Sequence, residues 1–260
     1  NPSKISCPNG IIGQNLEITI AKADPAFTHT LTYAFGSLTG TIVEKTAADV
    51  FSWLVPEEFF AEIPTSRREK CTITCTGYAG DMVMGISSCK CYIGVDTQRD
   101  KPMLFPSVTD ENAGTVLLTG DANTLVRYFS KAKVTLDIAV CPGAQIVEKY
   151  VTNSGGTHWI PTTVHAVQTG LFKFYATDSR GLKNSMEVTP PFVPYIKLTC
   201  NISNNKPDGD GNMVVHASGN CFVGSFGAVD NTLCVEYRYK PSGGEYGEWI
   251  AMPVTLGERT

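Results

Sequence analysis

The residues of this chain best suited to chemistry are its cysteines, and four of them lie close together in the sequence: Cys71, Cys75, Cys89 and Cys91. Four thiolates are a common tetrahedral ligand set for zinc. The first two belong to an alternating, strand-like stretch, where a spacing of four residues separates them by about 13 Å. A tetrahedral site needs its sulfur atoms roughly 4 Å apart. We therefore predict no zinc centre here and expect buried thiols that act as small hydrophobic side chains.

The complete set of nine cysteines is odd in number and spread over 260 residues. Such usage is not typical of a disulfide framework and fits a protein made in a reducing cytoplasm. The alternative to free thiols is a single cross-strand disulfide, if Cys71 and Cys89 face each other across a hairpin.

A second group of side chains offers oxygen ligands. Asp208, Asp210 and Asn212 stand at alternate positions of the stretch DGDGN, as at the start of a calcium-binding loop. The closing glutamate of such a loop is missing, because Val215 and His216 follow in place of further ligands. These three residues are the candidate metal ligands, and a hairpin turn explains them equally well.

Signatures of catalysis are missing from the sequence. It has four histidines: His29, His158, His165 and His216. No Gly-x-Ser-x-Gly elbow, His-Glu-x-x-His motif, phosphate loop or dinucleotide fingerprint accompanies them. The scattered acids nominate no carboxylate pair at the roughly 5–10 Å separation used in glycoside hydrolysis. We expect no catalytic residues, no cofactor and no enzymatic activity.

Three aromatic residues are candidates for ligand binding: Trp159, Tyr246 and Trp249. Trp159 follows two glycines, and the other two lie beside glycine-rich turns. Exposed aromatic rings stack on sugar faces or contribute to protein interfaces. Packing in a core is nevertheless the favoured interpretation of the tryptophans, above all of Trp53, which has apolar neighbours in the sequence.

Composition restricts the classes of partner. With 21 Lys and Arg against 25 Asp and Glu, the net charge of −4 argues against a nucleic-acid-binding protein. A hydrophobic content of 42% is enough for packed cores. Because no apolar run approaches about 20 residues, we expect no membrane insertion. The chain begins at Asn1 without a basic-then-apolar leader, so we expect a segment of a longer protein or a processed product.

The elements that must position these residues are mostly strands. Apolar and polar residues alternate in Leu16–Ile20, His29–Phe35 and Cys71–Tyr78, and Met82–Ile93 runs back after a glycine turn. Alternation with period two and glycine-containing turns indicates antiparallel hairpins with one buried face. The segment Pro56–Ile63 predicts one short helix, which Pro64 ends.

Two proline-rich stretches, Lys101–Pro106 and Thr189–Pro194, divide the chain. Proline removes N–H donors and fixes φ, so we predict semi-rigid joints at both places. The resulting organisation is all-β: a sandwich module with one short helix over residues 1–101, an immunoglobulin-like sandwich over residues 102–193, and a smaller module over residues 194–260.

Short strand patterns fill the second and third units. In the second unit they are Thr115–Thr119, Lys133–Val140, Gln145–Val151, His158–Ile160, Thr163–Val167, Gly170–Thr177 and Asn184–Val188. In the third unit they are Tyr195–Ile202, Met213–Cys221, Thr232–Lys240 and Glu248–Met252. Four strands would leave open edges, so the third module is either incomplete or completed by a partner.

Two further motifs have mainly structural interpretations. Ala176–Gly181 (ATDSRG) predicts a turn in which Asp178 and Ser179 bind their own backbone and Gly181 takes a positive φ. In Val235–Gly244 (VEYRYKPSGG), tyrosines alternate with Arg238 and Lys240, which predicts an aromatic core face and a basic solvent face.

Several stretches taken together carry a family resemblance. In order they are Thr30–Gly36 (TLTYAFG), Trp53 followed by Pro56 and Ile63-Pro64, Cys71–Tyr78 (CTITCTGY), Ala176–Gly181, and Val235–Gly244 before Trp249. This order resembles the repeated immunoglobulin-like modules of minor tail and tail-fibre proteins of long-tailed bacteriophages, mostly of Gram-positive hosts. The many cysteines and the run from Arg67 to Lys70 depart from that pattern.

The resemblance implies a non-enzymatic virion protein of the tail tip or fibre, made in the host cytoplasm, that serves as spacer, scaffold or host-surface binder. It implies other tail proteins, further copies of the chain and host cell-wall glycan as partners, and no catalytic residues. One alternative is a carbohydrate-binding or adhesin module of a bacterial surface protein. A second is the accessory β domains of an enzyme whose catalytic part lies elsewhere.

Overall fold

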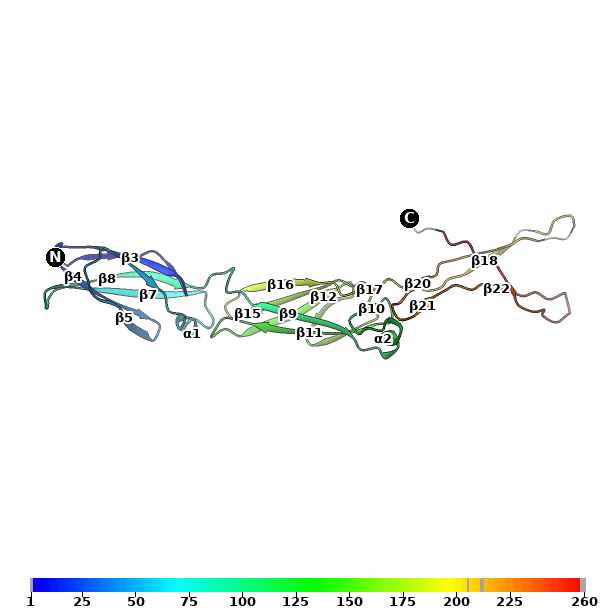
Figure 1. Cartoon of the computed structure of the whole chain (residues 1–260), viewed down its shortest axis with the longest axis horizontal. Helices are drawn as coiled ribbons and strands as arrows, with labels where there is room; N and C mark the ends of the chain where they lie inside the picture. The colour runs from blue at the N-terminus through cyan, green and yellow to red at the C-terminus, as the bar shows by residue number, and fades with distance from the viewer. Residues whose placement is uncertain (1, 205, 211–212, 258–260) are drawn as a thin grey trace.

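The computed structural model describes residues 2–204, 206–210 and 213–257. The molecule is long and narrow, with two β bodies in a row followed by a thinner C-terminal part (Figure 1). We call residues 2–95 the N-terminal body, residues 103–193 the middle body, and the described residues from 195 onward the C-terminal segment. In the described part of the chain, no helix is long and apolar enough to cross a membrane.

The N-terminal body consists of two sheets that face each other across one core. A three-stranded sheet has the order β1-β3-β6, and a five-stranded sheet has the order β2-β8-β7-β4-β5. The bounds are β1 (Lys4–Ser6), β2 (Gly10–Ile11), β3 (Asn15–Ala21), β4 (Thr28–Phe35), β5 (Leu38–Thr46), β6 (Val50–Leu54), β7 (Arg68–Ala79) and β8 (Met82–Gly94). The alternating patterns predicted β3, β4, β7 and β8, and the structure confirms all four.

The short helix is confirmed as α1 (Phe59–Glu62), which covers the end of this core. The ring of Phe59 stacks on Phe35 with centroids 4.3 Å apart. Trp53 is buried, as predicted, and stacks on Tyr33 at 5.3 Å. The apolar side of α1 therefore belongs to the core, and the backbone N–H of Ile63 closes the helix on the carbonyl oxygen of Phe60.

The middle body also has two principal sheets, in the orders β14-β11-β9 and β13-β12-β15-β16. A short parallel pair, β10 with β17, lies beside them. The bounds are β9 (Met103–Asp110), β10 (Leu125–Val126), β11 (Lys131–Ala139), β12 (Ile146–Asn153), β13 (Gly156–Trp159), β14 (Thr162–His165), β15 (Phe172–Asp178), β16 (Lys183–Val188) and β17 (Phe192–Val193). Val134 from one sheet and Phe172 and Phe174 from the other are completely buried in a shared core.

The predicted strand Thr115–Thr119 is wrong, because this segment lies in helix α2 (Ala113–Thr119). The side chain of Asn112 accepts a hydrogen bond from the backbone N–H of Gly114 and caps the helix start. Gly120, with φ 73°, ends the helix in the left-handed conformation. These capping residues outweigh the β-branched composition that favoured a strand.

The two proline-rich stretches, predicted as semi-rigid joints, lie largely in paired strands. Residues 103–106 belong to β9, where Pro106 stands opposite Leu136. Because β9 is an edge strand, the missing N–H of a proline does not break a central ladder. In the second stretch, Phe192 and Val193 form β17 and pair with β10. Both stretches are therefore built into the middle body.

The C-terminal segment consists of three short strand pairs rather than a packed module. They are β18 (Asn201–Asn204) with β19 (Val215–Ser218), β20 (Gly224–Ser225) with β21 (Asp230–Asn231), and β22 (Glu236–Tyr237) with β23 (Ile250–Ala251). Phe226 is its one buried hydrophobic side chain among the described residues, and it packs with Val126 and Val193 of the middle body. The observed strands are shorter than those predicted from the sequence.

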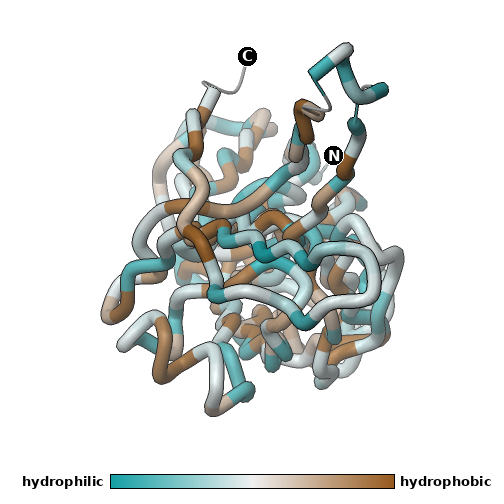
Figure 2. The backbone as a smooth tube through the Cα atoms, turned by 90° about the vertical axis from the view of Figure 1, so that its right-hand side faces the viewer, coloured by the Kyte–Doolittle hydropathy of each residue, from teal (hydrophilic) through white to brown (hydrophobic). Residues whose placement is uncertain are grey.

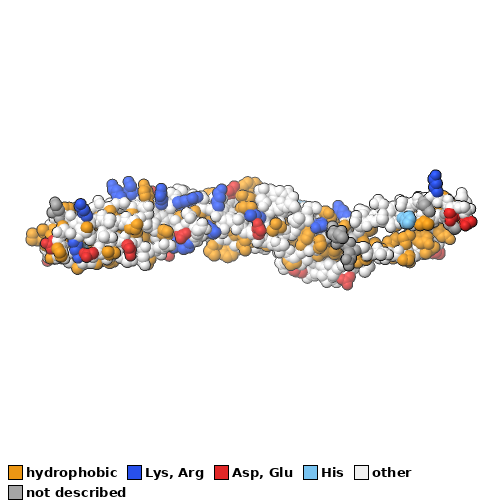
Figure 3. Space-filling model, turned by 90° about the horizontal axis from the view of Figure 1, so that it is seen from above, with side chains coloured by type: hydrophobic (Ala, Val, Ile, Leu, Met, Phe, Trp, Pro, Cys, Tyr) orange, Lys and Arg blue, Asp and Glu red, His pale blue; other side chains and the backbone are white. Residues whose placement is uncertain are grey.

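Hydrophobic residues of the C-terminal segment thus face solvent. Viewed along the molecule, hydrophobic stretches lie in its open loops (Figure 2). From above, hydrophobic side chains gather along one side of the segment (Figure 3). Leu198, Ile202 and Tyr239 are each about two-thirds exposed or more.

Candidate functional site

The turn between β15 and β16, residues 178–181, reaches out of the middle body and binds the N-terminal body. The Arg180 guanidinium donates from Nε to the carbonyl oxygen of Ile63 at 2.8 Å and from Nη2 to that of Phe60 at 2.8 Å. Nη2 also donates to the carbonyl oxygen of Pro142 at 2.6 Å. Arg180 is only 4% exposed, so these charge-assisted bonds lie away from water.

The same turn is held by hydrogen bonds of its own residue Asp178 and by Arg67 of the N-terminal body. The Asp178 carboxylate is fully buried, and its Oδ1 accepts from the backbone N–H groups of Arg180 and Leu182. Leu182 then packs into the core of the N-terminal body. In return, Arg67 of the N-terminal body donates to the carbonyl oxygens of Arg180 and Gly181. We call this set of contacts the joint.

Gly143 shows how closely the two bodies approach at the joint. Its φ is +79°, and a Cβ atom added there would lie 2.8 Å from the carbonyl oxygen of Phe60 and 3.1 Å from Cα of Ala61. Real Cβ atoms are not found that close to backbone, so only glycine fits this position.

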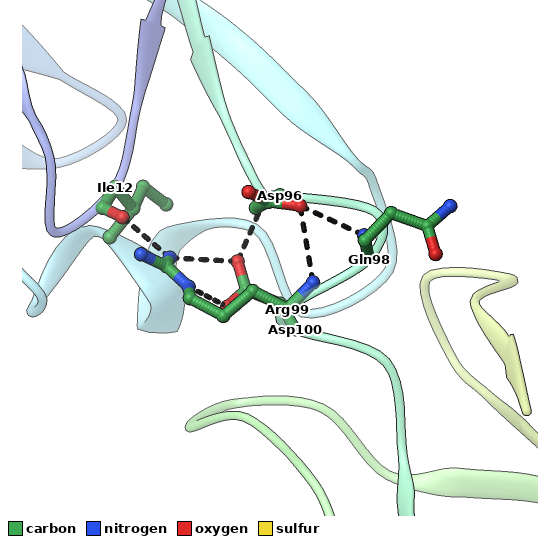
Figure 4. Close-up of polar contacts among 5 residues, drawn as sticks. All are labelled: Ile12, Asp96, Gln98, Arg99 and Asp100. Carbon is green, nitrogen blue, oxygen red and sulfur yellow. Dashed lines mark hydrogen bonds and ion pairs between the residues drawn. The ribbon is translucent and has the colours of Figure 1, made fainter.

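The chain that connects the two bodies, residues 96–100, is itself ordered by hydrogen bonds (Figure 4). Asp96 Oδ1 accepts from the backbone N–H groups of Gln98 and Arg99, and Asp100 Oδ2 accepts from that of Asp96. Arg99 pairs with Asp100 at 2.6 Å and donates to the carbonyl oxygen of Ile12 at 2.7 Å. Residues 96–100 therefore form a closed loop that Arg99 holds on the N-terminal body.

The structure brings two of the three aromatic candidates together. Tyr246 and Trp249 are 54% and 56% exposed, and the Arg238 guanidinium lies 4.5 Å and 4.6 Å from their ring centroids. Lys240 lies 5.1 Å from the ring of Tyr246. We call Arg238, Tyr246 and Trp249 the aromatic cluster. It combines flat rings that can stack on sugars with a cation that can bind carboxylate or phosphate.

The core face predicted for the tyrosines around Arg238 is wrong. Tyr237 and Tyr239 are 43% and 66% exposed, because no second sheet covers this hairpin in the described residues.

The third aromatic candidate lies on a different part of the molecule. Trp159 ends β13 on the middle body and is 65% exposed, with its ring 5.7 Å from Tyr150. It borders an open groove of about 580 Å³ whose lining also includes Asp137 and Lys149. Trp159 and the aromatic cluster are thus two separate candidate surfaces.

Two of the candidate metal ligands, Asp208 and Asp210, form a turn. Asp208 Oδ1 accepts from the backbone N–H of Asp210 at 3.0 Å, which is an Asx-turn. Asn212 lies outside the described residues. Within the described ranges, no group of three or more His, Cys, Asp or Glu side chains is placed to hold a metal ion.

His29, which contacts Ser3, has a structural role. Ser3 Oγ and His29 Nε2 lie 2.8 Å apart, and both residues are buried in the N-terminal body. Ser3 Oγ also accepts from the backbone N–H of Ala23. Burial lowers the pKa of the His29 imidazole, which favours its neutral form. This pair braces the beginning of the chain.

Comparison with known proteins gives one family. No curated protein matches the sequence. Among solved structures, the chain is similar to the fibronectin(III)-like modules of Clostridium thermocellum CbhA, with 11% identity, 72% of this chain and 94% of that chain covered, and a TM-score of 0.26. Residues 1–217 match the family described as "Siphovirus protein of unknown function (DUF859)", and the chain belongs to this family of siphovirus proteins.

Proposed function

We propose that the protein is a non-enzymatic structural component of the phage tail, at the tip or in a fibre, that acts as a stiff spacer. The joint is the observation that carries the proposal. A flexible linker would leave the two bodies independent, whereas Arg180, Arg67 and Leu182 tie each body to the other. Buried, charge-assisted bonds of this kind oppose bending, as a spacer requires.

The finer features of the proposal follow the resemblance to tail proteins. The two bodies are immunoglobulin-like modules, the protein is located in the virion tail, and its partners are other tail proteins. We also propose self-association through the C-terminal segment, whose short strand pairs leave backbone edges open. Sedimentation analysis tests this step: the full chain is expected to form oligomers, and a chain that stays monomeric at high concentration contradicts it.

The tail location is tested on virions. Antibodies against the purified chain, carried on gold particles, are expected to label the tail of intact phage particles in electron micrographs. Mass spectrometry of gradient-purified virions should detect peptides of the chain. Absence of the chain from infectious virions, with known capsid proteins detected in the same sample, would refute a structural role.

A second function, binding of host cell-wall glycan, is favoured by the aromatic cluster. Arg238 between two exposed rings supplies both stacking and charge. Binding of the labelled full chain to cell walls of Gram-positive strains tests it. Saturable binding that soluble wall glycan competes supports host attachment, whereas no binding by the assembled protein leaves the spacer function alone. The alternative function, an adhesin module of a bacterial surface protein, would also require a glycan-binding surface.

A further inference from the structure

The first residues of the chain lie alongside β8 in a fixed register. Ser87 Oγ donates to the carbonyl oxygen of Ser3 at 2.6 Å. Asn9 Oδ1 accepts from the backbone N–H of Tyr92 at 2.9 Å, and Gly10 pairs with Ile93 in the parallel ladder of β2 and β8. Residues 3–10 therefore follow residues 87–93, held at both ends.

Cys7 lies within this stretch, and the register brings it to Cys89. The two Sγ atoms are 3.1 Å apart, and both side chains are half-buried free thiols. A disulfide bond has an S–S length of about 2.05 Å, so the atoms need to approach by only about 1 Å. Because the contacts on either side hold the two segments together, the thiols meet without any rearrangement of the fold.

The pairing predicted as an alternative from the sequence is wrong. Cys71 stands opposite Cys91 in the β7–β8 ladder, and Cys89 stands opposite Ile73. Cys71, Cys75 and Cys91 are also buried in the core, away from small oxidants in solution. Cys7 and Cys89 are the members of this thiol group that are partly exposed.

We propose that Cys7 and Cys89 form a disulfide after the protein leaves a reducing cytoplasm. Both S–H bonds break and one S–S bond forms. The two electrons and two protons pass to dissolved oxygen, which becomes hydrogen peroxide. The timing rests on the proposed function as a virion protein, whereas the pairing rests on the geometry alone.

The environment of the thiols is consistent with survival of the reduced form inside the cell. Contact with Cys89 lowers the pKa of Cys7, but contact with Cys91 and burial outweigh it and raise this pKa to about 11. Contact with Cys7 and burial raise the pKa of Cys89. Because the thiolate is the reactive form, few molecules are primed to oxidise at neutral pH. The bond, once formed, locks the beginning of the chain to β8, so a pull on the N-terminus is not able to peel it away.

The test is disulfide mapping of the full chain. The protein is purified under reducing conditions, incubated in air-saturated buffer, alkylated, and digested without reductant for mass spectrometry. We expect one linked peptide pair containing Cys7 and Cys89, and a higher melting temperature that falls back when dithiothreitol is added. Cys7→Ser should abolish the linked pair and the response to dithiothreitol, whereas Cys234→Ser, at an exposed position of the C-terminal segment, should keep both.

Two outcomes would overturn the proposal: linkage of Cys7 to Cys91, or complete alkylation of both thiols after prolonged oxidation of the wild-type chain. Differential alkylation of the wild-type protein keeps the test valid even if Cys7→Ser fails to fold. Mapping on the isolated chain decides the pairing independently of the tail location. If the same bond is absent from purified virions that contain the chain, only the timing is refuted.

Discussion

Arg180 in the middle body donates a 2.8 Å hydrogen bond to the carbonyl oxygen of Ile63 in the N-terminal body, across 117 positions of sequence. The acceptor lies just beyond α1, whose apolar side chains are occupied in the core. At the end of the helix, the buried guanidinium donates to the carbonyl oxygens of Phe60 and Ile63. The sequence of residues 176–181 predicts only a local turn. The hydrogen bonds of Arg180 show that this turn also connects the two bodies.

Replacing Arg180 should loosen the joint. Arg180→Ala removes bonds to three carbonyl groups and leaves them without this donor. We expect a loss of about 3 kcal/mol in the free energy of unfolding, since bonds to charged groups contribute about 1.5–3 kcal/mol each and the losses are partly compensated by water. Denaturant unfolding measures it. Arg68→Ala, at an exposed position, is the control and should cost less than about 1 kcal/mol.

Close approach at Gly143 gives a second test. Gly143→Ala places a methyl group 2.8 Å from the carbonyl oxygen of Phe60, so the bodies must separate or the backbone must shift. Gly243→Ala is a matched control, because Gly243 has nearly the same positive φ, +77°, but a Cβ there meets nothing within 4 Å. The melting temperature should fall more for Gly143→Ala. Equal losses would mean that backbone strain alone matters and that the close contact does not.

Acid should weaken the loop that connects the bodies. The backbone N–H groups of Gln98 and Arg99 lower the pKa of the Asp96 carboxyl group below its ordinary value. Since the folded-state pKa is below the unfolded one, ionised Asp96 stabilises the fold above about pH 4, and this stabilisation is lost as the pH falls through the folded-state pKa. Unfolding measured from pH 6 down to pH 2 should show a shallower acid dependence for Asp96→Asn. Identical curves for the two proteins would contradict this role of the carboxylate.

The aromatic cluster should affect binding and not stability. Arg238→Ala and Trp249→Ala change side chains that face solvent, so the melting temperature should stay within about 1 °C of wild type. Binding to cell-wall glycan should fall at least tenfold in both, as titration of labelled protein on cell walls would show. Tyr239→Ala, a 66% exposed neighbour, is the control. Loss of binding in the control as well would indicate a general apolar surface and not this cluster.

The sequence predicts those parts of the fold that follow from local periodicity. Alternation identified β7 and β8, and clustered apolar residues placed Trp53 in a core. Periodicity failed where one or two residues decide the secondary structure. The segment Thr115–Thr119 was predicted as a strand, but Asn112 and Gly120 cap it as helix α2. The joint was missed for a different reason, because Arg180 and Phe60 are 120 positions apart and no local pattern connects them.

For the candidate sites, too, contacts between residues far apart in the sequence could not be predicted. Packing in a core was the favoured interpretation of Trp159 and Trp249, and it is wrong, because both are exposed, as is Tyr246. The sequence did not indicate that Arg238 joins Tyr246 and Trp249 or that Cys7 meets Cys89, since both arrangements need the register of paired strands.

The central claim, that the first two bodies move as one unit, is tested most directly by residual dipolar couplings. Couplings of backbone amides in residues 4–94 and 103–193 of the full chain, measured in one aligned sample, report the orientation of each body. A stiff spacer predicts that a single alignment tensor fits both sets, and that Arg180→Ala makes the two tensors diverge in magnitude. Two tensors of different magnitude in the wild-type protein would show independent bodies and contradict the spacer function.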